Sequence, residues 1–228
     1  MTRIILFLAL LTGSIALRAQ DCGSYFAFQK GLKFELTSYD KKDKPAALLK
    51  YQIIDYKPVN GGTSLVFSNE TYDPKGKLLA KGESFGKCID GSYYTDVRNI
   101  SSDMIPKAAN LRMDITGDQL TYPAKLNVGD KLNDASVTVK SSLESGMTLM
   151  TLTVNIVDRQ VAGMETVETP AGTFDCVKIT YTINMRLMGN RTLKGTEYLA
   201  KGIGVVKSEQ VNEKGQKQSS MMLTKLEK

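Results

Sequence analysis

The stretch VKITYTINMRL, residues 177–187, alternates apolar and polar side chains over its whole length. A period of two places the apolar side chains on one face of an extended strand and the polar side chains on the other. The pattern recurs in residues 150–156, where threonine and asparagine separate Met150, Leu152, Val154 and Ile156. Both stretches therefore predict strands with one buried face and one hydrated face.

Shorter alternating runs continue along most of the chain. They lie at residues 34–39, 47–56, 63–72, 111–116, 135–141, 203–211 and 219–226. Turn signals separate them, and the clearest is Asp73-Pro74-Lys75-Gly76, in which proline presets one turn dihedral and glycine takes the left-handed position. Hairpins between strands that bury one face favour antiparallel pairing. We therefore predict an all-β fold: a large curved antiparallel sheet, half-barrel or sandwich of roughly eleven strands.

One segment interrupts the strand pattern. Residues 99–110 combine helix-capping residues with small and helix-favouring ones, which predicts a short helical crossover that Pro106 interrupts. We expect at most this one short helix. No linker and no shift in composition divides the chain, so residues 20–228 are predicted to form a single β-rich domain.

Residues 1–19 have the organisation of a secretory signal peptide. Arg3 gives a positive start, an apolar run follows, and small residues lead to a predicted cleavage site after Ala19. The apolar run is too short to span a membrane, and no later stretch reaches the required length. The sequence predicts a protein that is exported to the periplasm or the exterior and is soluble after signal cleavage, with no membrane span.

Cys22 stands just behind this cleavage site. A lipidated cysteine needs small, uncharged residues before it, but Gln20 and Asp21 precede Cys22, so no lipid anchor is expected. In an oxidising compartment Cys22 and Cys88, both in polar sequence that flanks strands, favour a disulfide worth roughly 4 kcal/mol. Cys176 is expected to be a buried thiol. Three pairings are possible, and the sequence alone does not choose among them.

The composition excludes several kinds of chemistry. The chain has no histidine, so Ser-His and Cys-His nucleophile pairs and imidazole metal sites cannot form, and three cysteines are too few for a four-ligand zinc site. No catalytic residue, metal or cofactor is predicted. Carboxylate-pair glycoside hydrolysis survives as an enzymatic alternative. The lysines are scattered around predicted turns, so the formal charge of +6 does not predict a nucleic-acid partner.

Several short motifs lack the context that their chemistry requires. Residues 82–87 (GESFGK) do not have Walker A spacing, and Ser84-x-x-Lys87 lacks the partner motifs of penicillin-binding enzymes. The polar loop at residues 127–134 lacks the alternating acidic ligands of a calcium loop and predicts a solvated turn. Residues 202–204 (GIG) open a strand and predict close backbone packing or a bulge.

The apolar side of the predicted strands is rich in methionine. Flexible thioethers suit surfaces that accept varied apolar ligands, although ordinary core packing is the alternative. A curved sheet with such a face can enclose a lipid-like ligand. The predicted ligand face consists of Met150, Leu152, Val154, Ile156, Ile179, Tyr181, Ile183 and Met185.

Three stretches give the chain a resemblance to a known family. They are YPAKLNVGDKL (residues 122–132), TPAGTFDCVKITY (residues 169–181) and YLAKGIGVVKSE (residues 198–209), followed by a short C-terminal hairpin. In this order they resemble the TapB-like family of exported Gram-negative bacterial proteins, a domain of unknown function. The most specific part is residues 169–174, and the resemblance covers most of the chain after the signal peptide.

The resemblance implies a mostly antiparallel β fold related to half-barrels of lipid-carrying envelope proteins. It transfers no catalytic residue. Tyr198 departs from the family pattern, in which a tryptophan is expected. The early cysteine of the family and a second one after the third or fourth strand match Cys22 and Cys88, which favours that pairing.

These observations predict a non-enzymatic envelope protein that binds a lipid-like ligand or another envelope component in a curved β sheet. The alternative is a structural or adaptor protein that docks an envelope partner through its sheet surface or an edge. A third hypothesis is a carboxylate-dependent hydrolase.

Overall fold

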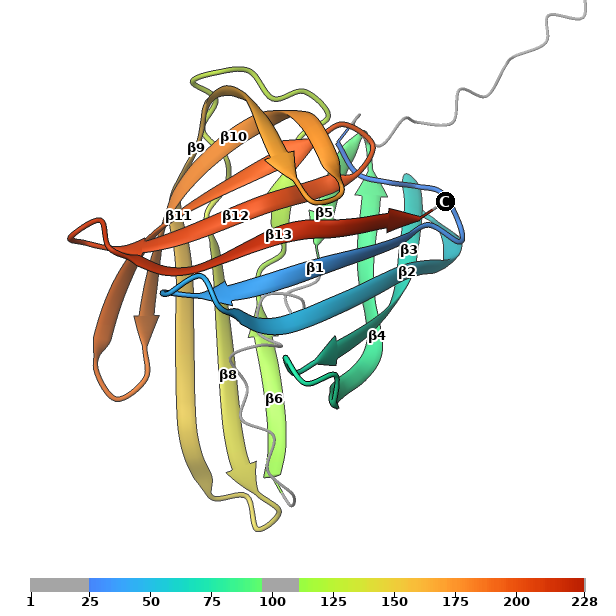
Figure 1. Cartoon of the computed structure of the whole chain (residues 1–228). Helices are drawn as coiled ribbons and strands as arrows, with labels where there is room; N and C mark the ends of the chain where they lie inside the picture. Colours follow the sequence, from blue (N-terminus) through green and yellow to red (C-terminus); the bar gives the residue numbers. More distant parts are fainter. Residues whose placement is uncertain (1–24, 96–110, 228) are drawn as a thin grey trace, which may run out of the picture.

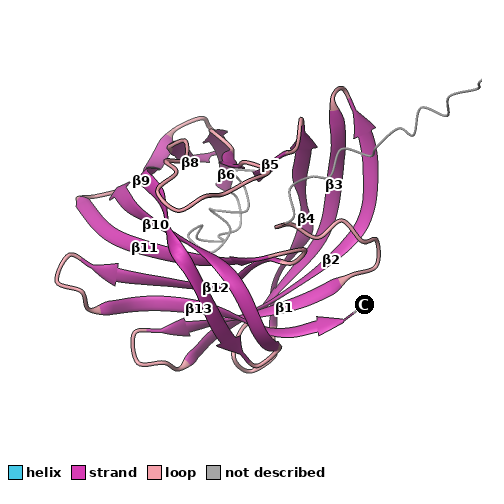
Figure 2. Ribbon diagram, turned by 90° about the horizontal axis from the view of Figure 1, so that it is seen from above, coloured by secondary structure: helices cyan, strands magenta, loops and turns pink. Residues whose placement is uncertain are grey.

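The computed structural model describes residues 25–95 and 111–227. Within these ranges there is no helix, and thirteen strands form a single sheet in which all paired strands are antiparallel (Figures 1 and 2). Likewise, the described residues contain no helix with the length and apolarity needed to cross a membrane. The predicted signal peptide, Cys22 and the predicted helical crossover at residues 99–110 lie outside the described residues.

The strands account for most of the described chain. They are β1 (Lys33–Asp40), β2 (Pro45–Val59), β3 (Gly62–Tyr72), β4 (Leu78–Ile89), β5 (Ser92–Thr95), β6 (Leu111–Gly117), β7 (Leu120–Tyr122), β8 (Ala135–Leu143), β9 (Thr148–Thr169), β10 (Gly172–Arg186), β11 (Asn190–Ala200), β12 (Gly204–Asn212) and β13 (Lys217–Glu227). The all-β, antiparallel prediction is confirmed.

The predicted number of strands is slightly too low, for a local reason. β5 has four residues and β7 has three, which is too short for alternation to show. β9 has 22 residues, of which the predicted strand at residues 150–156 is only a part. Asp158 has a φ of 56°, and the register of β9 with β10 shifts between Thr180 and Thr182. This irregularity breaks the alternation and hides the second half of β9.

The order of the strands shows that the sheet curves back on itself. The order is β6-β8-β9-β10-β11-β12-β13-β1-β2-β3-β4-β5-β7, so β6 and β7 are the two edges. Only Asp118 and Gln119 separate these edge strands in the sequence. The backbone N–H of Asp118 donates to the carbonyl of Ser136 (2.8 Å), and its carboxylate accepts from the Ser136 N–H (3.1 Å). The edges therefore meet at one point but do not pair, and the sheet is not closed.

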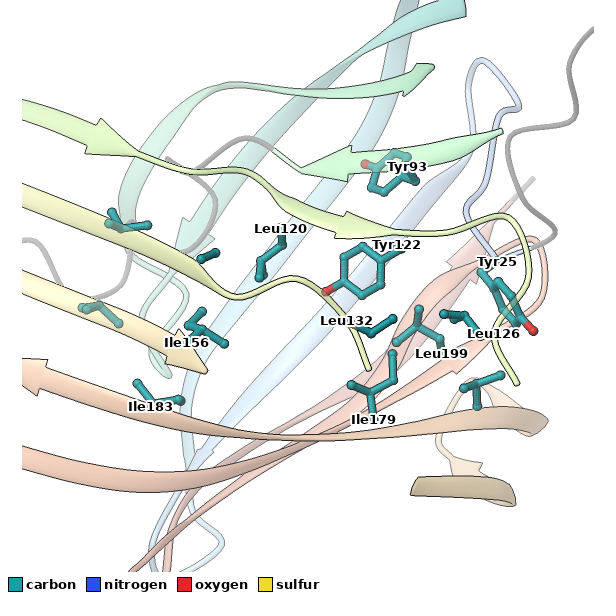
Figure 3. Packing of buried hydrophobic residues seen from close by; sticks show 14 of the residues in the cluster. Tyr25, Tyr93, Leu120, Tyr122, Leu126, Leu132, Ile156, Ile179, Ile183 and Leu199 are labelled. Atoms are coloured by element: carbon teal, nitrogen blue, oxygen red, sulfur yellow. The ribbon is translucent and has the colours of Figure 1, made fainter. Parts of the chain in front are cut away.

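The main hydrophobic core lies inside this curve (Figure 3). Of the predicted ligand face, Leu152, Val154, Ile156, Ile179 and Ile183 are buried members of this core. The remaining members, Tyr181, Met185 and Met150, are partly buried, and the first two pack against the core. The predicted face therefore forms much of the core, and ligand binding by it stays a prediction.

Candidate functional site

A second apolar surface forms a pocket of about 170 Å³. It lies between the segment before β1, the strands β1–β5, and the pair β12 and β13. None of the eight residues of the predicted ligand face lines it. Its lining residues are Phe26, Ala27, Phe34, Leu36, Tyr51, Phe67, Ser84, Tyr93, Ile203, Gly204, Val205 and Leu223. We call it the aromatic pocket.

Stacked aromatic rings form its walls. The ring of Phe26 stacks on that of Tyr93, with centroids 3.8 Å apart and an interplanar angle of 16°. Phe34 stacks on Tyr51 at 5.4 Å and 18°. Phe67 meets Phe34 edge to face at 6.4 Å. Such ring pairs hold each other in place, so these walls are preorganised by contacts within the chain.

The register of the sheet brings these residues together. Phe34 is opposite Tyr51 in β1 and β2, and Phe67 of β3 is opposite Ser84 of β4. Phe67 is also opposite Ile53, which is fully buried in the main core. Directly opposed residues share a face of the sheet. The aromatic pocket therefore lies on the side of these strands that faces the core.

Two glycines lie against the rings, and one of them makes room for its ring. A Cβ atom at Gly86 would lie 2.3 Å from the hydroxyl oxygen of Tyr93, so the Tyr93 ring can cover this position only because it is glycine. A Cβ at Gly204 would lie 3.4 Å from the Phe26 ring. Gly204 therefore lies in ordinary contact with the Phe26 ring, and the predicted close backbone packing or bulge at residues 202–204 stays a prediction. Burial raises the pKa of the Tyr93 hydroxyl.

Ser84 is the unusual residue of this pocket. Its side chain is 3% exposed, and its hydroxyl has no hydrogen-bond partner in the described part of the chain. A buried hydroxyl without a partner costs about 1–3 kcal/mol, so native cores rarely keep one. In the sequence Ser84 appears only in a chance Ser-x-x-Lys match. Ser84 could have been identified only from its position opposite the aromatic residue Phe67. That position depends on the register of β3 and β4, which the sequence does not give.

The opposite face of the same strands carries a charged groove. Its charged lining residues are Lys33, Glu35, Lys50, Glu70, Lys225 and Glu227. Lys50 pairs with Glu35 at 3.3 Å, and Lys81, at its margin, pairs with Glu70 at 2.9 Å. Tyr72 donates a hydrogen bond of 2.6 Å to Glu70, and chiefly this bond lowers the pKa of Glu70. The charged side chains of this groove do not line the aromatic pocket, but Phe34 and Tyr51 line both, so the two hollows adjoin at this ring pair.

A third group of functional side chains is buried inside the curve of the sheet. Arg159 of β9 is 2% exposed, Glu197 of β11 is 7% exposed and Tyr122 of β7 is 4% exposed. The guanidinium carbon of Arg159 lies 4.9 Å from the centre of the Tyr122 ring. We call these three residues the Arg159 cluster.

Arg159 holds loop backbone in place. Its Nη1 donates to the carbonyl oxygens of Thr121 (3.2 Å) and Asn133 (2.9 Å). Its Nη2 has no hydrogen-bond partner in the described ranges and lies 4.0 Å from Oε1 of Glu197. Burial raises the pKa of Glu197, while Arg159 and the hydrogen bond from Tyr122 act in the opposite direction. The cluster thus joins β7, β9, β11 and the loop at residues 123–134 around one buried charge pair.

The polar loop at residues 127–134 is largely exposed, as predicted for a solvated turn, and only Leu132 of it is buried. Asp130 does cap a turn, because its carboxylate accepts a hydrogen bond of 2.7 Å from the Asn127 N–H. However, the backbone of Asp130 accepts from the Val161 N–H, and Leu132 donates to the carbonyl of Arg159. Leu132 is also buried in the core. The loop is therefore a solvated turn that is also tied to β9 by backbone hydrogen bonds and by the burial of Leu132.

The cysteines behave differently from one another. Cys88 is 2% exposed. Cys176 is free, and its thiol lies 3.4 Å from the carbonyl oxygen of Phe174, to which it donates. Burial is the main reason why the pKa of Cys176 rises to about 11. Its prediction as a buried thiol is confirmed. Because Cys22 lies outside the described residues, its pairing with Cys88 stays a prediction.

The described residues contain no group of three or more histidine, cysteine or acidic side chains that could hold a metal ion. The chain offers instead an aromatic pocket with one unpartnered hydroxyl, an ion-paired groove and a buried charge cluster. The aromatic pocket is the best candidate for a binding site, because it combines an apolar wall with an unmet hydrogen-bonding group.

Comparison with solved structures places the fold among known proteins. A candidate exported protein of Bacteroides fragilis with a YmcC-like fold has a TM-score of 0.76 and 26% identity, covering 91% of this chain and all (100%) of that chain. A candidate lipoprotein of Parabacteroides distasonis has a TM-score of 0.77 and 24% identity, with the same coverage of 91% and 100%. No functionally curated protein matches the chain in sequence.

The comparison with family models does not confirm the predicted TapB-like name. The model that matches, over residues 29–223, is described as DUF3108-like. All three stretches that carried the resemblance lie within this range. Tyr122 of the first stretch and Tyr181 of the second lie at the Arg159 cluster. The chain therefore belongs to the DUF3108-like family, whose name denotes a domain of unknown function.

Proposed function

We propose that this protein is an exported, non-enzymatic envelope protein that binds a lipid-like ligand in the aromatic pocket. The observation that carries the proposal is the unpartnered hydroxyl of Ser84 inside a wall of aromatic rings. The signal-peptide pattern of residues 1–19 and the description of the B. fragilis relative as a candidate exported protein support export. Membership of the narrower TapB-like family is part of the same proposal.

The size of the pocket limits the ligand. An apolar cavity of about 150 Å³ accommodates one benzene ring, whereas pockets for drug-sized molecules start at about 300 Å³. At about 170 Å³, the aromatic pocket suits one end of a larger apolar molecule rather than a whole lipid. We therefore propose an acyl chain whose end group, a carboxyl, ester or hydroxyl, meets the Ser84 hydroxyl.

The other functional hypotheses have weaker support. A glycoside hydrolase needs a carboxylic acid with a raised pKa beside a second carboxylate in an open cleft. In the charged groove, hydrogen bonds lower the pKa of Glu70 and of Glu227. Glu197, whose pKa is raised, is buried against Arg159. An adaptor role needs an exposed surface that fits a partner protein, and the projecting hairpin ends described below offer no concave surface for one.

The test is binding of decanoic acid by the exported protein. A fluorescent apolar probe, N-phenylnaphthylamine, is bound first and then displaced by decanoic acid. Ser84→Leu fills the pocket and removes the hydroxyl, so binding is expected to be abolished. Ser84→Ala removes only the hydroxyl and is expected to weaken binding about two- to tenfold, the effect of one hydrogen bond.

Ser220 provides a matched control. It is 4% exposed, and its hydroxyl also lacks a hydrogen-bond partner among the described residues, but it does not line the pocket. Ser220→Ala is therefore expected to bind decanoic acid like the unmodified protein. Equal affinity of Ser84→Leu and the unmodified protein would refute the site. Lipid extraction of protein purified from the periplasm, analysed by mass spectrometry, tests for a native ligand independently.

A further inference from the structure

Exposed apolar side chains gather at two neighbouring hairpin ends. Met147 and Leu149, in and just after the turn between β8 and β9, are 58% and 51% exposed. Leu187 and Met188, in the turn between β10 and β11, are 45% and 95% exposed. Single exposed apolar residues are common on protein surfaces. Four of them on two adjacent hairpins form a patch, and such patches mark interaction sites.

The register places both hairpin ends at the same end of the sheet. β9 lies between β8 and β10 in the sheet. Thr148, at the start of β9, is opposite Ser142 of β8, and Arg186, at the end of β10, is opposite Thr153 of β9. The β10–β11 turn therefore lies level with the first residues of β9, and the β8–β9 turn projects beyond it at the same end of the sheet. In Figure 1 both turns point towards the lower edge of the picture.

Other hairpin ends of the same protein are polar. The turn between β1 and β2 contains Lys41, Lys42 and Asp43, and the turn between β12 and β13 contains Glu213 and Lys214. Apolar exposure is therefore not a general property of the turns in this chain. Leu78 and Leu79, just after the β3–β4 turn, are also exposed (46% and 48%), but the two exposed methionines in turns, Met147 and Met188, both lie where β8, β9, β10 and β11 end.

The charge around the two apolar turns is mainly basic. Arg186 and Arg191 flank the β10–β11 turn, and both are exposed. Lys140, near the end of β8, is exposed as well. Glu144 is the acidic residue in the β8–β9 turn. A basic collar around an apolar tip matches an anionic lipid surface, because the cations meet the head groups while the apolar side chains enter the acyl region.

We infer that these two hairpin ends dock the protein on an anionic lipid bilayer. Narrow projecting turns offer no concave surface for a folded partner, whereas a fluid bilayer accepts them without shape complementarity. The basic collar sets the preference for anionic head groups. The inference is independent of the aromatic pocket, since no residue of these turns lines it.

The experiment is flotation of the exported protein with vesicles of two compositions. One set contains phosphatidylethanolamine with phosphatidylglycerol, and the other contains phosphatidylcholine alone. Binding is expected to the anionic vesicles and to weaken as salt is added. Met147→Gln and Met188→Gln keep the side-chain length but remove the apolar group. Each substitution is expected to weaken vesicle binding on the order of tenfold, because one methionine side chain no longer enters the bilayer.

Matched controls separate docking from general effects. Met164 is also an exposed methionine of β9 (61%), but it is opposite Val177 in the other half of the strand, so Met164→Gln is expected to bind vesicles normally. Ser84→Leu is expected to bind vesicles normally too. Arg186→Gln with Arg191→Gln is expected to lose the preference for anionic vesicles, whereas Lys214→Gln keeps it.

Three results would overturn the inference. The first is no flotation with either set of vesicles. The second is vesicle binding by the variant carrying both Met147→Gln and Met188→Gln that equals binding by the unmodified protein. A loss of vesicle binding in Met164→Gln as large as in this double variant would count in the same way. The third is self-association in sedimentation velocity that the double methionine variant abolishes without any vesicle binding, because the tips would then bind a second copy of the protein.

Discussion

The hydroxyl of Tyr122 donates a hydrogen bond of 3.3 Å to the carboxylate of Glu197. Tyr122 ends the edge strand β7, whereas Glu197 lies on β11, far from β7 in the order of the sheet. The bond therefore crosses the inside of the curve. Since β6 and β7 do not pair, this bond and the contacts of Arg159 help to hold the β7 edge against the other half of the sheet.

Removing the Tyr122 hydroxyl tests this role. Tyr122→Phe keeps the ring beside Arg159 but takes a donor from the buried Glu197 carboxylate. We expect the free energy of unfolding to fall by about 1.5–3 kcal/mol, the range for a hydrogen bond to a charged group. Urea unfolding measures the change. Tyr39, a half-buried tyrosine of β1, serves as the control, and a similar loss in Tyr39→Phe would contradict a specific role for Tyr122.

Arg159→Met is expected to be among the most destabilising single substitutions. It leaves the Glu197 carboxyl buried without its cation and frees the carbonyl groups of Thr121 and Asn133. A broken buried pair costs about 3–5 kcal/mol. The double variant with Glu197→Leu is expected to recover part of this loss, because the unpaired charge is removed. Calorimetric unfolding of both single variants and the double variant measures the coupling, and purely additive effects would argue against it.

Glu197 also predicts how stability depends on pH. Burial raises its folded-state pKa above the ordinary value of 4.5. Between these two pKa values the folded carboxyl keeps a proton that the unfolded chain has released, so the free energy of unfolding falls as pH rises through this window. The fall is at most about 1.4 kcal/mol for each pH unit.

The matched variant for this prediction is Glu197→Gln, which cannot titrate. Urea unfolding of both proteins from pH 4.5 to neutral pH is expected to show the variant gaining stability relative to the unmodified protein. A difference between the two proteins that stays constant across this range would contradict a raised pKa at Glu197.

Two glycines in extended strands are expected to respond oppositely to alanine. A Cβ at Gly195 of β11 would lie 2.2 Å from the ring of Tyr181, whereas a Cβ at Gly163 of β9 has no atom within 4 Å. Gly195→Ala is expected to cost about 1–3 kcal/mol through overpacking. Gly163→Ala is expected to be neutral or to stabilise by about 0.5 kcal/mol. If Tyr181→Leu does not restore stability to Gly195→Ala, the clash is not the cause.

Thiol labelling tests the predicted pairing of Cys22 with Cys88. In the folded protein Cys176 is 1% exposed, and burial raises its pKa to about 11. It is therefore expected to react slowly with iodoacetamide. After unfolding without reductant, one thiol per molecule is expected to react, and all three cysteines of the chain after reduction. Labelling of all three without reductant, measured by intact mass, would mean that no disulfide exists.

The strands with regular alternation were predictable, and the reason lies in the extended backbone. Residues 177–187 alternate clearly because β10 buries one face along most of its length. β4 did not show this signal, because glycines and charged residues surround Ser84 and Gly86. The aromatic pocket depends on β4, so its hydroxyl could not be identified from the sequence.

The predicted ligand face shows the same limit. Alternation correctly placed Leu152, Val154 and Ile156 on one face of β9, but it cannot say what that face meets. In the structure these residues join a core with Ile53 and Tyr122 from the opposite half of the sheet. Whether an apolar face touches solvent, ligand or other strands is decided by the curvature, which is a property of all thirteen strands together.

Side-chain alternation and turn residues alone specified an all-β, antiparallel protein, because strand period and turn conformation are local properties of the backbone. The tertiary structure decided the rest. Tyr122, Arg159 and Glu197 are far apart in the sequence and carry no common motif, yet the curvature of the sheet brings them together. Register placed Ser84 opposite Phe67 and so created the aromatic pocket, since pairing between distant strands determines which side chains share a face.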